Sequence, residues 1–467
     1  MSKARVDTTF STLAELCSAG VLASGNPEIR AVCTDSRVCE PESLFVALAG
    51  ERSDGHRYIE DARNRGAIAA MISVDWAGGH RSELDQLRAE GMSFLLCPSP
   101  LSGLQALAAE YRRSVTEPFT IGITGSNGKT TTKELLGSIL RGGGNAYVTR
   151  GNLNSEIGLP LSVLELTNEH RFGVFEMAMN HPGEMRDLAR VLRPRLALIT
   201  NIGTAHIGIL GSKQAIAEEK KQIFSQFTGA ETAFLYESEP YYDFLRKDVR
   251  GEIVMYGERS TPGYRGYRDL GVRGNLLYWY DREIHLPLPG AFNVRNALAA
   301  MAVAIHVGMS EEQIATGIEG VATLFGRSEV LDGPVTIVQD CYNANPDSVR
   351  EAVSLAARTE RTDGRTVLVL GDMAELGAYS AELHDEVLRD VVASGADRVF
   401  LFGELFREAA SRLRDAGKLG GTELSATSDF DQLRRHVVEF VREGDLVLIK
   451  GSRSMELERL TPYLREE

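Results

Sequence analysis

Short apolar runs alternate with turn-rich and helical stretches along most of the 467-residue chain. In the first region, residues 44–48 (LFVAL) and 67–72 (AIAAMI) have the length of strands, and helical spacing over 101–111 predicts the helix that ends this region. The second region opens with the apolar run 119–124 (FTIGIT), and a glycine-rich loop then leads to a helical pattern over 130–140. The pattern therefore predicts strands that alternate with helices.

The middle of the chain continues this rhythm. Residues 173–177 and 196–201 are candidates for buried strands, and each is followed by polar residues and then by a helical stretch. This order is typical of βαβ units in a parallel sheet. Residues 251–290 differ, because short strand-like runs are separated there by Gly or Pro turns, and they predict a hairpin-rich appendage.

The last third has the pattern of a smaller α/β domain. Residues 367–370 (VLVL), 398–402 (RVFLF) and 446–449 (LVLI) predict parallel strands, and helical stretches such as 431–442 lie between them. A chain of this length also exceeds one compact core. We therefore expect an α/β protein of three domains, covering residues 1–115, 116–325 and 326–467.

Composition narrows the class of protein. Hydrophobic residues make up 43% and charged residues 25%, as in ordinary globular domains. The formal net charge of −14 argues against sequence-independent nucleic-acid binding, which needs a basic face. It does not exclude anionic small substrates, because local cations and backbone N–H groups hold those.

Targeting and redox signals point to the cytoplasm. The first residues contain no apolar segment like that of a signal peptide, and no run of about 18 apolar residues predicts a membrane span. The five cysteines are scattered without a C-x-x-C pair, so neither a disulfide framework nor a zinc site is expected. We expect a cytoplasmic protein without membrane insertion, working as a monomer.

The strongest chemical signal is the segment GITGSNGKTTT at 122–132, between an apolar strand and a helix. Glycines there allow backbone N–H groups to converge on phosphate oxygens, and the helix N-terminus adds positive potential. Lys129 would reach the β and γ phosphates, and the Thr130 hydroxyl would reach Mg²⁺. A turn with an accidental lysine is the ordinary alternative, and the flanking strand and helix argue against it. The loop residues expected to bind nucleotide are Gly125, Ser126, Asn127, Gly128, Lys129, Thr130 and Thr131.

Two further residues end predicted strands, where parallel sheets place ligands. Glu176 closes the run 173–177, and a buried carboxylate there suits a Mg²⁺ ligand better than an isolated charge. A structural ion pair is its alternative. His206 follows the run 196–201, but a lone histidine is more often a packing residue than a ligand. Lys220 and Lys221 would by composition alone be a solvated helix face.

These motifs together resemble the Mur ligase family. The phosphate loop, the strand-end glutamate and the run TNIGTAH (200–206) occur in the family's order. Several segments resemble the member that adds D-alanyl-D-alanine, and the resemblance extends from about residue 8 to residue 460. These segments are TDSR (34–37), EMAMNHPGE (176–184), DCYNANPDS (340–348), GDMAELG (371–377) and KGSRSM (450–455).

The resemblance implies a reaction. It indicates an ATP-dependent, ADP-forming ligase of peptidoglycan synthesis that joins D-alanyl-D-alanine to a UDP-N-acetylmuramoyl-tripeptide through an acyl phosphate. It also implies a UDP-binding N-terminal α/β domain, a central P-loop domain and a Rossmann-like C-terminal ligase domain. The chain departs from the family pattern at Cys341, where serine is more common, and at Gly208, where glutamate often follows the metal-binding histidine.

The resemblance also implies roles for individual residues. Mg²⁺, with two ions expected, would bind Thr130, Glu176, His206 and a carbamylated lysine, which the spacing from His206 places at Lys220 rather than Lys221. Lys129, His206, Lys220 and Arg327 would act in catalysis. Further nucleotide contacts would come from Asn296, Arg327, Asp340, Asn343 and Asn345. The substrate would bind Asp35, Ser36 and Arg37, with Asp54, Gly55 and His56 nearby, and Asn152, Asn154 and Ser155.

Three alternatives remain at this point. A sister ligase that adds the third amino acid shares the phosphate loop, but the segments at 340–348 and 371–377 argue against it. A P-loop ATPase or GTPase switch predicts a strand ending in aspartate or an N-K-x-D motif, and the strand-end acid here is Glu176. A non-catalytic paralogue is disfavoured by the intact candidate residues.

Overall fold

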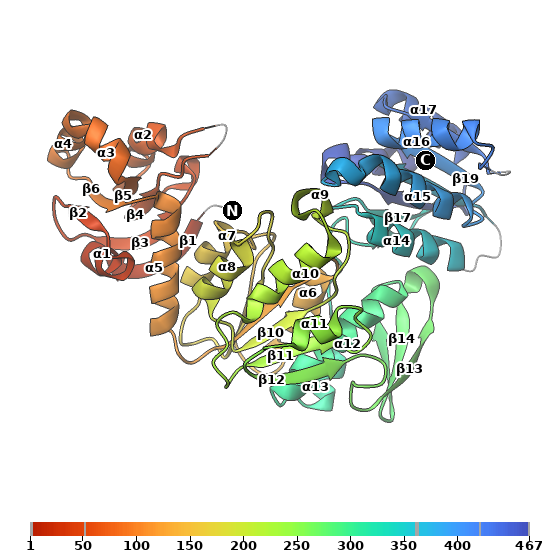
Figure 1. Cartoon of the computed structure of the whole chain (residues 1–467), viewed down its shortest axis with the longest axis horizontal. Coiled ribbons are helices and arrows are strands. Elements are labelled where there is room, and N and C mark those ends of the chain that lie inside the picture. The colour runs from red at the N-terminus through yellow and green to blue at the C-terminus, as the bar shows by residue number, and fades with distance from the viewer. Residues whose placement is uncertain (1–2, 51–52, 360–363, 420–421, 466–467) are drawn as a thin grey trace.

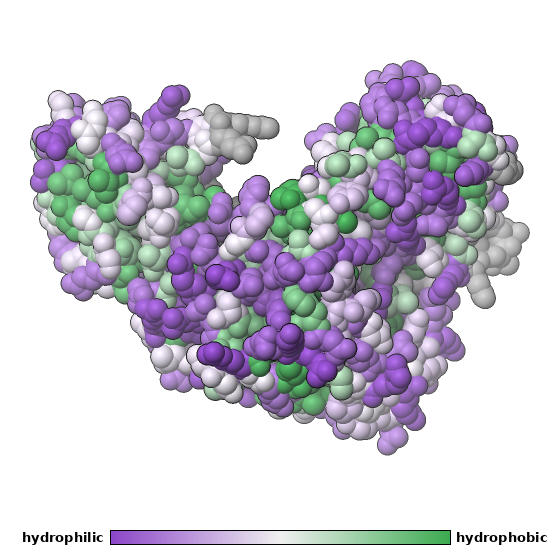
Figure 2. Space-filling model, viewed as in Figure 1, coloured by the Kyte–Doolittle hydropathy of each residue, from purple (hydrophilic) through white to green (hydrophobic). Residues whose placement is uncertain are grey.

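The structure is a computed structural model that describes residues 3–50, 53–359, 364–419 and 422–465. Three α/β lobes follow one another along the chain, and the N-terminal and C-terminal lobes lie on opposite sides of the central lobe (Figure 1). The space-filling view shows a hollow between the two outer lobes (Figure 2). Among the described residues, no helix has the length and apolarity needed to cross a membrane.

The N-terminal lobe is built on a six-stranded sheet in the order β1-β3-β4-β5-β6-β2. Its four inner strands are parallel, and the two edge strands are antiparallel to their neighbours. The long helix α5 continues the predicted 101–111 helix and leads out of the lobe. The elements are β1 (Lys3–Thr9), α1 (Phe10–Cys17), β2 (Gly20–Leu22), β3 (Glu28–Cys33), η1 (Ser36–Val38), β4 (Ser43–Val46), η2 (Gly55–Tyr58), α2 (Ile59–Asn64), β5 (Ala67–Ser73), α3 (Val74–Gly79), α4 (Arg81–Ala89), β6 (Ser93–Cys97) and α5 (Pro100–Ser114).

The central lobe contains a fully parallel sheet in the order β12-β11-β10-β7-β9-β8. The strand order reverses around β7, so the loops after β7, β9 and β10 meet at one edge, where such sheets bind ligands. The elements that form the lobe are β7 (Phe119–Thr124), α6 (Lys129–Arg141), β8 (Ala146–Val148), α7 (Gly158–Leu164), β9 (Phe172–Glu176), α8 (Glu184–Leu192), β10 (Leu196–Ile199), α9 (Ile207–Leu210), α10 (Lys213–Lys221), η3 (Gln222–Phe224), β11 (Thr232–Tyr236), α11 (Tyr242–Arg246), β12 (Glu252–Tyr256), α12 (Ala291–His306) and α13 (Glu311–Glu319).

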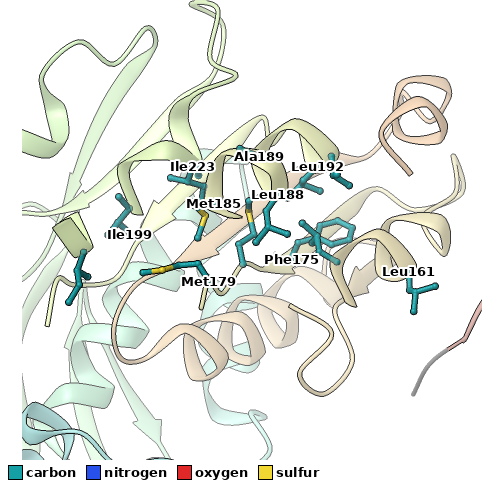
Figure 3. Packing of buried hydrophobic residues seen from close by; sticks show 14 of the residues in the cluster. Leu161, Phe175, Met179, Met185, Leu188, Ala189, Leu192, Ile199 and Ile223 are labelled. Carbon is teal, nitrogen blue, oxygen red and sulfur yellow. The ribbon is translucent and has the colours of Figure 1, made fainter. Parts of the chain in front are cut away.

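Helices cover both faces of this sheet because its strands are apolar on both sides. On β9, Val174 and Phe175 point to opposite faces and join different buried clusters. Figure 3 shows the cluster that contains Phe175, to which Met185 and Leu188 of α8 and Ile199 of β10 also belong. The other face is covered by α6 and α12, and α13 packs against α6. The sheet is thereby held rigid beneath the loops at its edge.

The segment 251–290 differs in part from the prediction. Its last three strands form the expected antiparallel appendage, made of β13 (Tyr264–Asp269), β14 (Asn275–Trp279) and β15 (Arg282–Leu286), with the 3-10 turn η4 (Gly271–Arg273). Its first strand, β12, instead pairs in parallel with β11 at the edge of the central sheet. An edge strand is only half covered, so β12 lacks the continuous apolar run that identified the inner strands.

The C-terminal lobe has the sheet order β16-β17-β21-β18-β19-β20, which is parallel except for β16. The three predicted strands are present as β18, β19 and β21. The elements are β16 (Glu329–Leu331), β17 (Thr336–Asp340), α14 (Pro346–Arg358), β18 (Thr366–Gly371), η5 (Gly377–Tyr379), α15 (Ser380–Val392), β19 (Arg398–Phe402), α16 (Glu404–Asp415), β20 (Leu424–Thr427), α17 (Phe430–Phe440), β21 (Leu446–Lys450), η6 (Arg453–Met455), η7 (Leu457–Leu460) and α18 (Thr461–Arg465).

Candidate active site at the edge of the central sheet

The phosphate loop between β7 and α6 has a backbone that requires glycine. Gly125 and Gly128 have φ values of 151° and 81°, which side chains with a Cβ rarely adopt. A Cβ on Gly125 would overlap Thr200 Oγ1, and a Cβ on Gly128 would overlap Asn296 Oδ1. Both glycines therefore meet two constraints, a left-handed conformation and a close neighbour.

The segment that follows β10 fixes the loop in place. Asn201 accepts the Asn127 N–H through its side chain at 3.0 Å and the Ser126 N–H through its backbone carbonyl at 2.9 Å. The Thr200 hydroxyl and the Asn201 side-chain amide both donate to Asn127 O, at 2.6 and 3.0 Å. These four hydrogen bonds hold the backbone of the loop in place.

Lys129 is folded onto the loop that it follows. Its Nζ donates to Gly125 O at 2.8 Å and to Ser126 O at 3.3 Å. Burial lowers the pKa of Lys129, the Glu176 carboxylate raises it, and the Arg327 charge lowers it further. Arg327 also lines a small pocket together with Thr131 of the same loop.

A carboxylate lies at the base of the loop. Glu176 ends β9 with 2% of its surface exposed, and both of its oxygens have donors. The Thr130 hydroxyl donates to Oε2 at 2.7 Å, and Asn154 Nδ2 donates to Oε1, also at 2.7 Å. The structure thus brings together Thr130 and Glu176, which were predicted as metal ligands, and Asn154, which was predicted to bind the substrate.

His206 lies at the carboxyl end of the neighbouring strand β10, in a left-handed conformation with φ of 65°. Its buried Nδ1 has no hydrogen-bond partner, although Glu375 Oε2 of the C-terminal lobe lies 3.0 Å away. The His206 ring lowers the pKa of Glu375. Sequence reasoning did not single out Glu375, whose only signal was its place in the GDMAELG segment.

The two lysines at the end of α10 point in different directions. Lys220 is 1% exposed, and burial, reinforced by the charge of Lys129, lowers its pKa well below the ordinary value. Lys221 instead donates to Phe244 O at 2.8 Å and lies over the Phe244 ring. Only Lys220 faces the phosphate-loop lysine.

The residues expected near the adenosine come from two lobes. Asn296 of α12 donates to Asn293 Oδ1 at 3.0 Å while its own oxygen touches Gly128. The Arg327 guanidinium lies 4.0 Å from the centre of the Tyr342 ring. These two residues therefore approach the loop from the central lobe and from the start of the C-terminal lobe.

The loop after β17 is held by a buried lysine, Lys450, which begins the KGSRSM segment but to which sequence reasoning gave no role. Lys450 Nζ donates to Asp340 Oδ2 at 2.7 Å and to Asn343 O at 3.1 Å. The Asn343 side chain accepts the Ala344 N–H at 2.8 Å. Asn345 caps α14 and donates through Nδ2 to Asn127 Oδ1 of the phosphate loop at 2.7 Å.

The candidate substrate residues of the N-terminal lobe form a separate group. Asp35 caps the turn η1 and accepts Arg37 Nη2 at 2.7 Å, so it has a structural role in this segment. The Arg37 side chain is 79% exposed, whereas Ser36 is buried. His56 is also buried, with Nδ1 bonded to Asp54 and Nε2 accepting the Ser73 N–H. His56 therefore holds the loop together.

Around the central site, Asn152 is exposed and Ser155 is partly buried on the same loop as Asn154. Among the residues described, no three His, Cys, Asp or Glu side chains converge on one point.

Known proteins resemble this chain over nearly its whole length. Three family models match it in order: "Mur ligase family, catalytic domain" at residues 28–111, "Mur ligase middle domain" at 123–304 and "Mur ligase, glutamate ligase domain" at 326–453. A UDP-N-acetylmuramoyl-tripeptide–D-alanyl-D-alanine ligase of Treponema pallidum is 42% identical over 93% of this chain and 94% of its own length. The chain belongs to the Mur ligase family.

Other Mur ligases agree in sequence and structure. A Bacillus subtilis protein of the same name as the Treponema one is 33% identical over 99% of both chains. A crystal structure of MurF from Acinetobacter baumannii has a TM-score of 0.88 at 29% identity, covering 99% of this chain and 100% of that one. MurF from Thermotoga maritima, solved in complex with ADP, has a TM-score of 0.78 at 26% identity, covering 93% and 96%. The predicted three-domain α/β architecture is confirmed.

Gly208, which departs from the family pattern, packs closely against the backbone of the C-terminal lobe. Gly208 N–H donates to Glu375 O at 3.1 Å, and a Cβ at this position would overlap Gly377 N and the Leu376 carbonyl carbon. Glycine thus allows the backbone of the C-terminal lobe to approach the segment after His206. In this Mur ligase the absence of a side chain at 208 is a packing requirement.

Proposed function

We propose that this protein is the ATP-dependent ligase that joins D-alanyl-D-alanine to UDP-N-acetylmuramoyl-tripeptide, forming ADP, phosphate and the UDP-muramoyl-pentapeptide of peptidoglycan synthesis. The observation that carries the proposal is the full-length similarity to ligases of this name, which extends over all three lobes. The preorganised phosphate loop beside a buried carboxylate supports the ATP-dependent step. The place of action is the cytoplasm, where these nucleotide-linked precursors are built.

ATP binds across the central and C-terminal lobes. The phosphate-loop N–H groups of residues 125–131 and Lys129 hold the phosphates, as the T. maritima relative with bound ADP supports. Asn296 lies at the adenine, Asp340 at the ribose with Asn343 and Asn345 in the same loop, and Arg327 at the phosphates. The domains divide at residues 1–115, 116–325 and 326–467.

Mg²⁺ fits the residues at the base of the loop. A buried hydroxyl (Thr130), a buried carboxylate (Glu176) and an imidazole nitrogen without a hydrogen bond (His206) are available donors. Bound Mg²⁺ would neutralise the negative charge of the phosphates.

Lys220 completes this site as a carbamate. A buried ammonium beside Lys129 is unfavourable, so its pKa is lowered and the neutral amine is favoured. The neutral amine adds to CO₂, forming an N–C bond and releasing one proton. The resulting anion would replace a repelling cation beside Lys129, and its oxygens would be available to Mg²⁺.

The reaction has two steps. The terminal carboxylate of the tripeptide attacks the γ-phosphorus, the bond to the ADP oxygen breaks, and an acyl phosphate forms. The neutral amine of D-alanyl-D-alanine then attacks the acyl carbon, and phosphate leaves as the amide forms. Lys129 and Arg327 balance the charge on the transferred group throughout.

The UDP-muramoyl substrate spans the hollow between the outer lobes. Asp35, Ser36 and Arg37 hold its nucleotide end in the N-terminal lobe. Asn152, Asn154 and Ser155 lie at the muramoyl end, where Asn154 already contacts Glu176. The tripeptide carboxylate is thereby directed toward the phosphate loop.

The test is phosphate release from MgATP with the two other substrates present or omitted. Release that requires both, with a new UDP-muramoyl-pentapeptide detected by mass, is the expected result. Release with a single amino acid in place of the dipeptide would make the protein a sister ligase. Release from ATP alone, unaffected by either substrate, would favour an ATPase switch and overturn the proposal.

A further inference from the structure

A fully buried lysine links the phosphate-loop helix to the candidate substrate loop. Lys133 of α6 has no exposed surface, and its Nζ donates to Thr149 O at 2.8 Å and to Gly151 O at 3.4 Å. The adjacent Glu134 carboxylate lies 2.9 Å from the same Nζ. A buried ammonium requires such acceptors. The lysine therefore holds two backbone carbonyls at the start of the loop in place.

The position of Lys133 on α6 relates it to the phosphate site. It lies three residues after Thr130 and four after Lys129, so the three side chains share one face of the helix. Thr130 contacts Glu176, and Lys133 contacts the backbone that leads to Asn154. Residues on one face of α6 thus contact both the Glu176 carboxylate beside the phosphate loop and the backbone of the substrate loop.

The far end of the loop is tied to the same site. Asn154 Nδ2 donates to Glu176 Oε1, and Asn154 O accepts the Ala178 N–H at 2.9 Å. The contacts form a closed circuit from α6 through Lys133 and the loop to Asn154, and back through Glu176 to Thr130. Between these anchors, Asn152 is exposed.

We infer that Lys133 is a positioning residue for the UDP-muramoyl-tripeptide, which fixes residues 149–154 so that the substrate carboxylate is presented to the phosphate loop. This inference rests on the proposed function. The contacts of Lys133 Nζ are with the Thr149 and Gly151 carbonyls and the Glu134 carboxylate, so it acts through the loop. Its removal would free two carbonyls and loosen the loop, while the phosphate-loop backbone, anchored by Asn201, keeps its own contacts.

The test compares Lys133→Met with Arg112→Met. Arg112 is a matched control because it is also a buried cation that donates to backbone carbonyls, those of Leu192 and Val115, away from the loop. Lys133→Met is expected to raise the KM for UDP-muramoyl-tripeptide about tenfold, with kcat and the KM for ATP changed less than about twofold. Arg112→Met lowers stability without this selective change.

Amide hydrogen exchange gives a readout that is independent of the reaction. Exchange in a peptide covering residues 149–155 should become faster in Lys133→Met and stay unchanged in Arg112→Met. If Lys133→Met does not fold, Lys133→Gln replaces it, since the shorter amide keeps a donor, and an intermediate change in both readouts is expected. An unchanged KM, or equal rises for ATP and the tripeptide, with unchanged exchange would overturn the inference. A wild-type protein that forms no pentapeptide would refute the proposed function instead, and the exchange comparison would still decide whether Lys133 anchors the loop.

Discussion

At the scale of single residues, the site is dominated by charges that burial makes unfavourable. Lys220 is nearly inaccessible and faces Lys129, and its own neighbour Glu219 offsets only part of the cost. Glu219 is already engaged, because its oxygens accept the N–H groups of Gly183 and Met185. A protein keeps such a lysine at a cost in stability, which indicates a chemical use for the amine.

The first prediction concerns Lys220→Met in buffer free of bicarbonate. The pKa of Lys220 lies below the ordinary 10.5, so the unfolded chain binds this proton more tightly than the folded protein. The resulting loss of folding stability is greatest at pH values below the lowered pKa, where Lys220 is charged in both states. It declines as pH rises toward 10.5. The variant should therefore be more stable than the wild type at about pH 7, and the gain should shrink toward about pH 10.

Urea unfolding at a series of pH values measures this difference. The exposed Lys213 supplies the control, since Lys213→Met should show no such pH-dependent gain. A wild-type protein that is more stable than Lys220→Met at every pH would mean that the amine is satisfied in the fold and has no reason to react with CO₂. The same variant should also lose ligase activity.

Single residues differ in how far sequence could reveal them. Gly125, Gly128 and Lys129 were recognisable because a phosphate loop is a local pattern between a strand and a helix. Lys133 and Lys450 were not, because a lysine in a helix or at a strand end resembles a surface residue until the fold buries it. Their partners lie 16 and 110 residues away in sequence, beyond the reach of any local rule.

At the scale of elements, apolar runs identified the buried strands well. Residues 119–124 and 398–402 coincide with β7 and β19, because inner parallel strands are apolar on both faces. Edge strands such as β8 and β12 were missed or assigned to the wrong sheet, since half-covered strands mix polar and apolar residues. Helix α14 combines two roles that sequence pattern cannot separate, because its cap residue also contacts another lobe.

The second prediction separates these roles of Asn345. Its side chain accepts the Ser348 N–H in a capping box and also donates to Asn127 of the phosphate loop. Asn345→Ala should cost about 0.5–2 kcal/mol of stability from the lost cap. It should in addition raise the KM for ATP several-fold, because Asn127 loses a partner.

Ser310→Ala is the matched control, since Ser310 forms the same kind of capping box on α13, outside the phosphate loop. Thermal unfolding should show similar losses for the two variants, and steady-state kinetics should show a change only for Asn345→Ala. An equal KM for ATP in both variants would reduce Asn345 to a helix cap.

At the scale of the whole molecule, the reaction requires parts that lie in different lobes. Asn345 of the C-terminal lobe donates to Asn127 of the phosphate loop, and Arg327 lines a small pocket together with Thr131, whereas Arg37 lies in the N-terminal lobe. A hollow separates the two outer lobes (Figure 2). The C-terminal lobe is already docked on the central lobe, with Asp347 accepting the Thr204 N–H and hydroxyl at 2.7 and 2.8 Å. Sequence could indicate three domains but not this docking, which depends on how whole surfaces fit.

The third prediction tests whether this docking is needed for activity. Gly208 contacts the backbone of 375–377 so closely that Gly208→Ala must displace the C-terminal lobe or the α9 segment. Overpacking of this kind typically costs about 1–3 kcal/mol, here concentrated at the interface. Small-angle X-ray scattering of the variant should show a larger radius of gyration, and kcat should fall while nucleotide binding to the central lobe persists.

Gly78→Ala is the control, because a Cβ there meets no atom within 4 Å and the position lies in the N-terminal lobe. A Gly208→Ala protein with wild-type dimensions and reduced kcat would place the effect at His206 itself, two residues away. Unchanged dimensions and unchanged kcat would show that the lobes do not need this contact, and that ATP alone brings Arg327 and Asn345 to the phosphate loop.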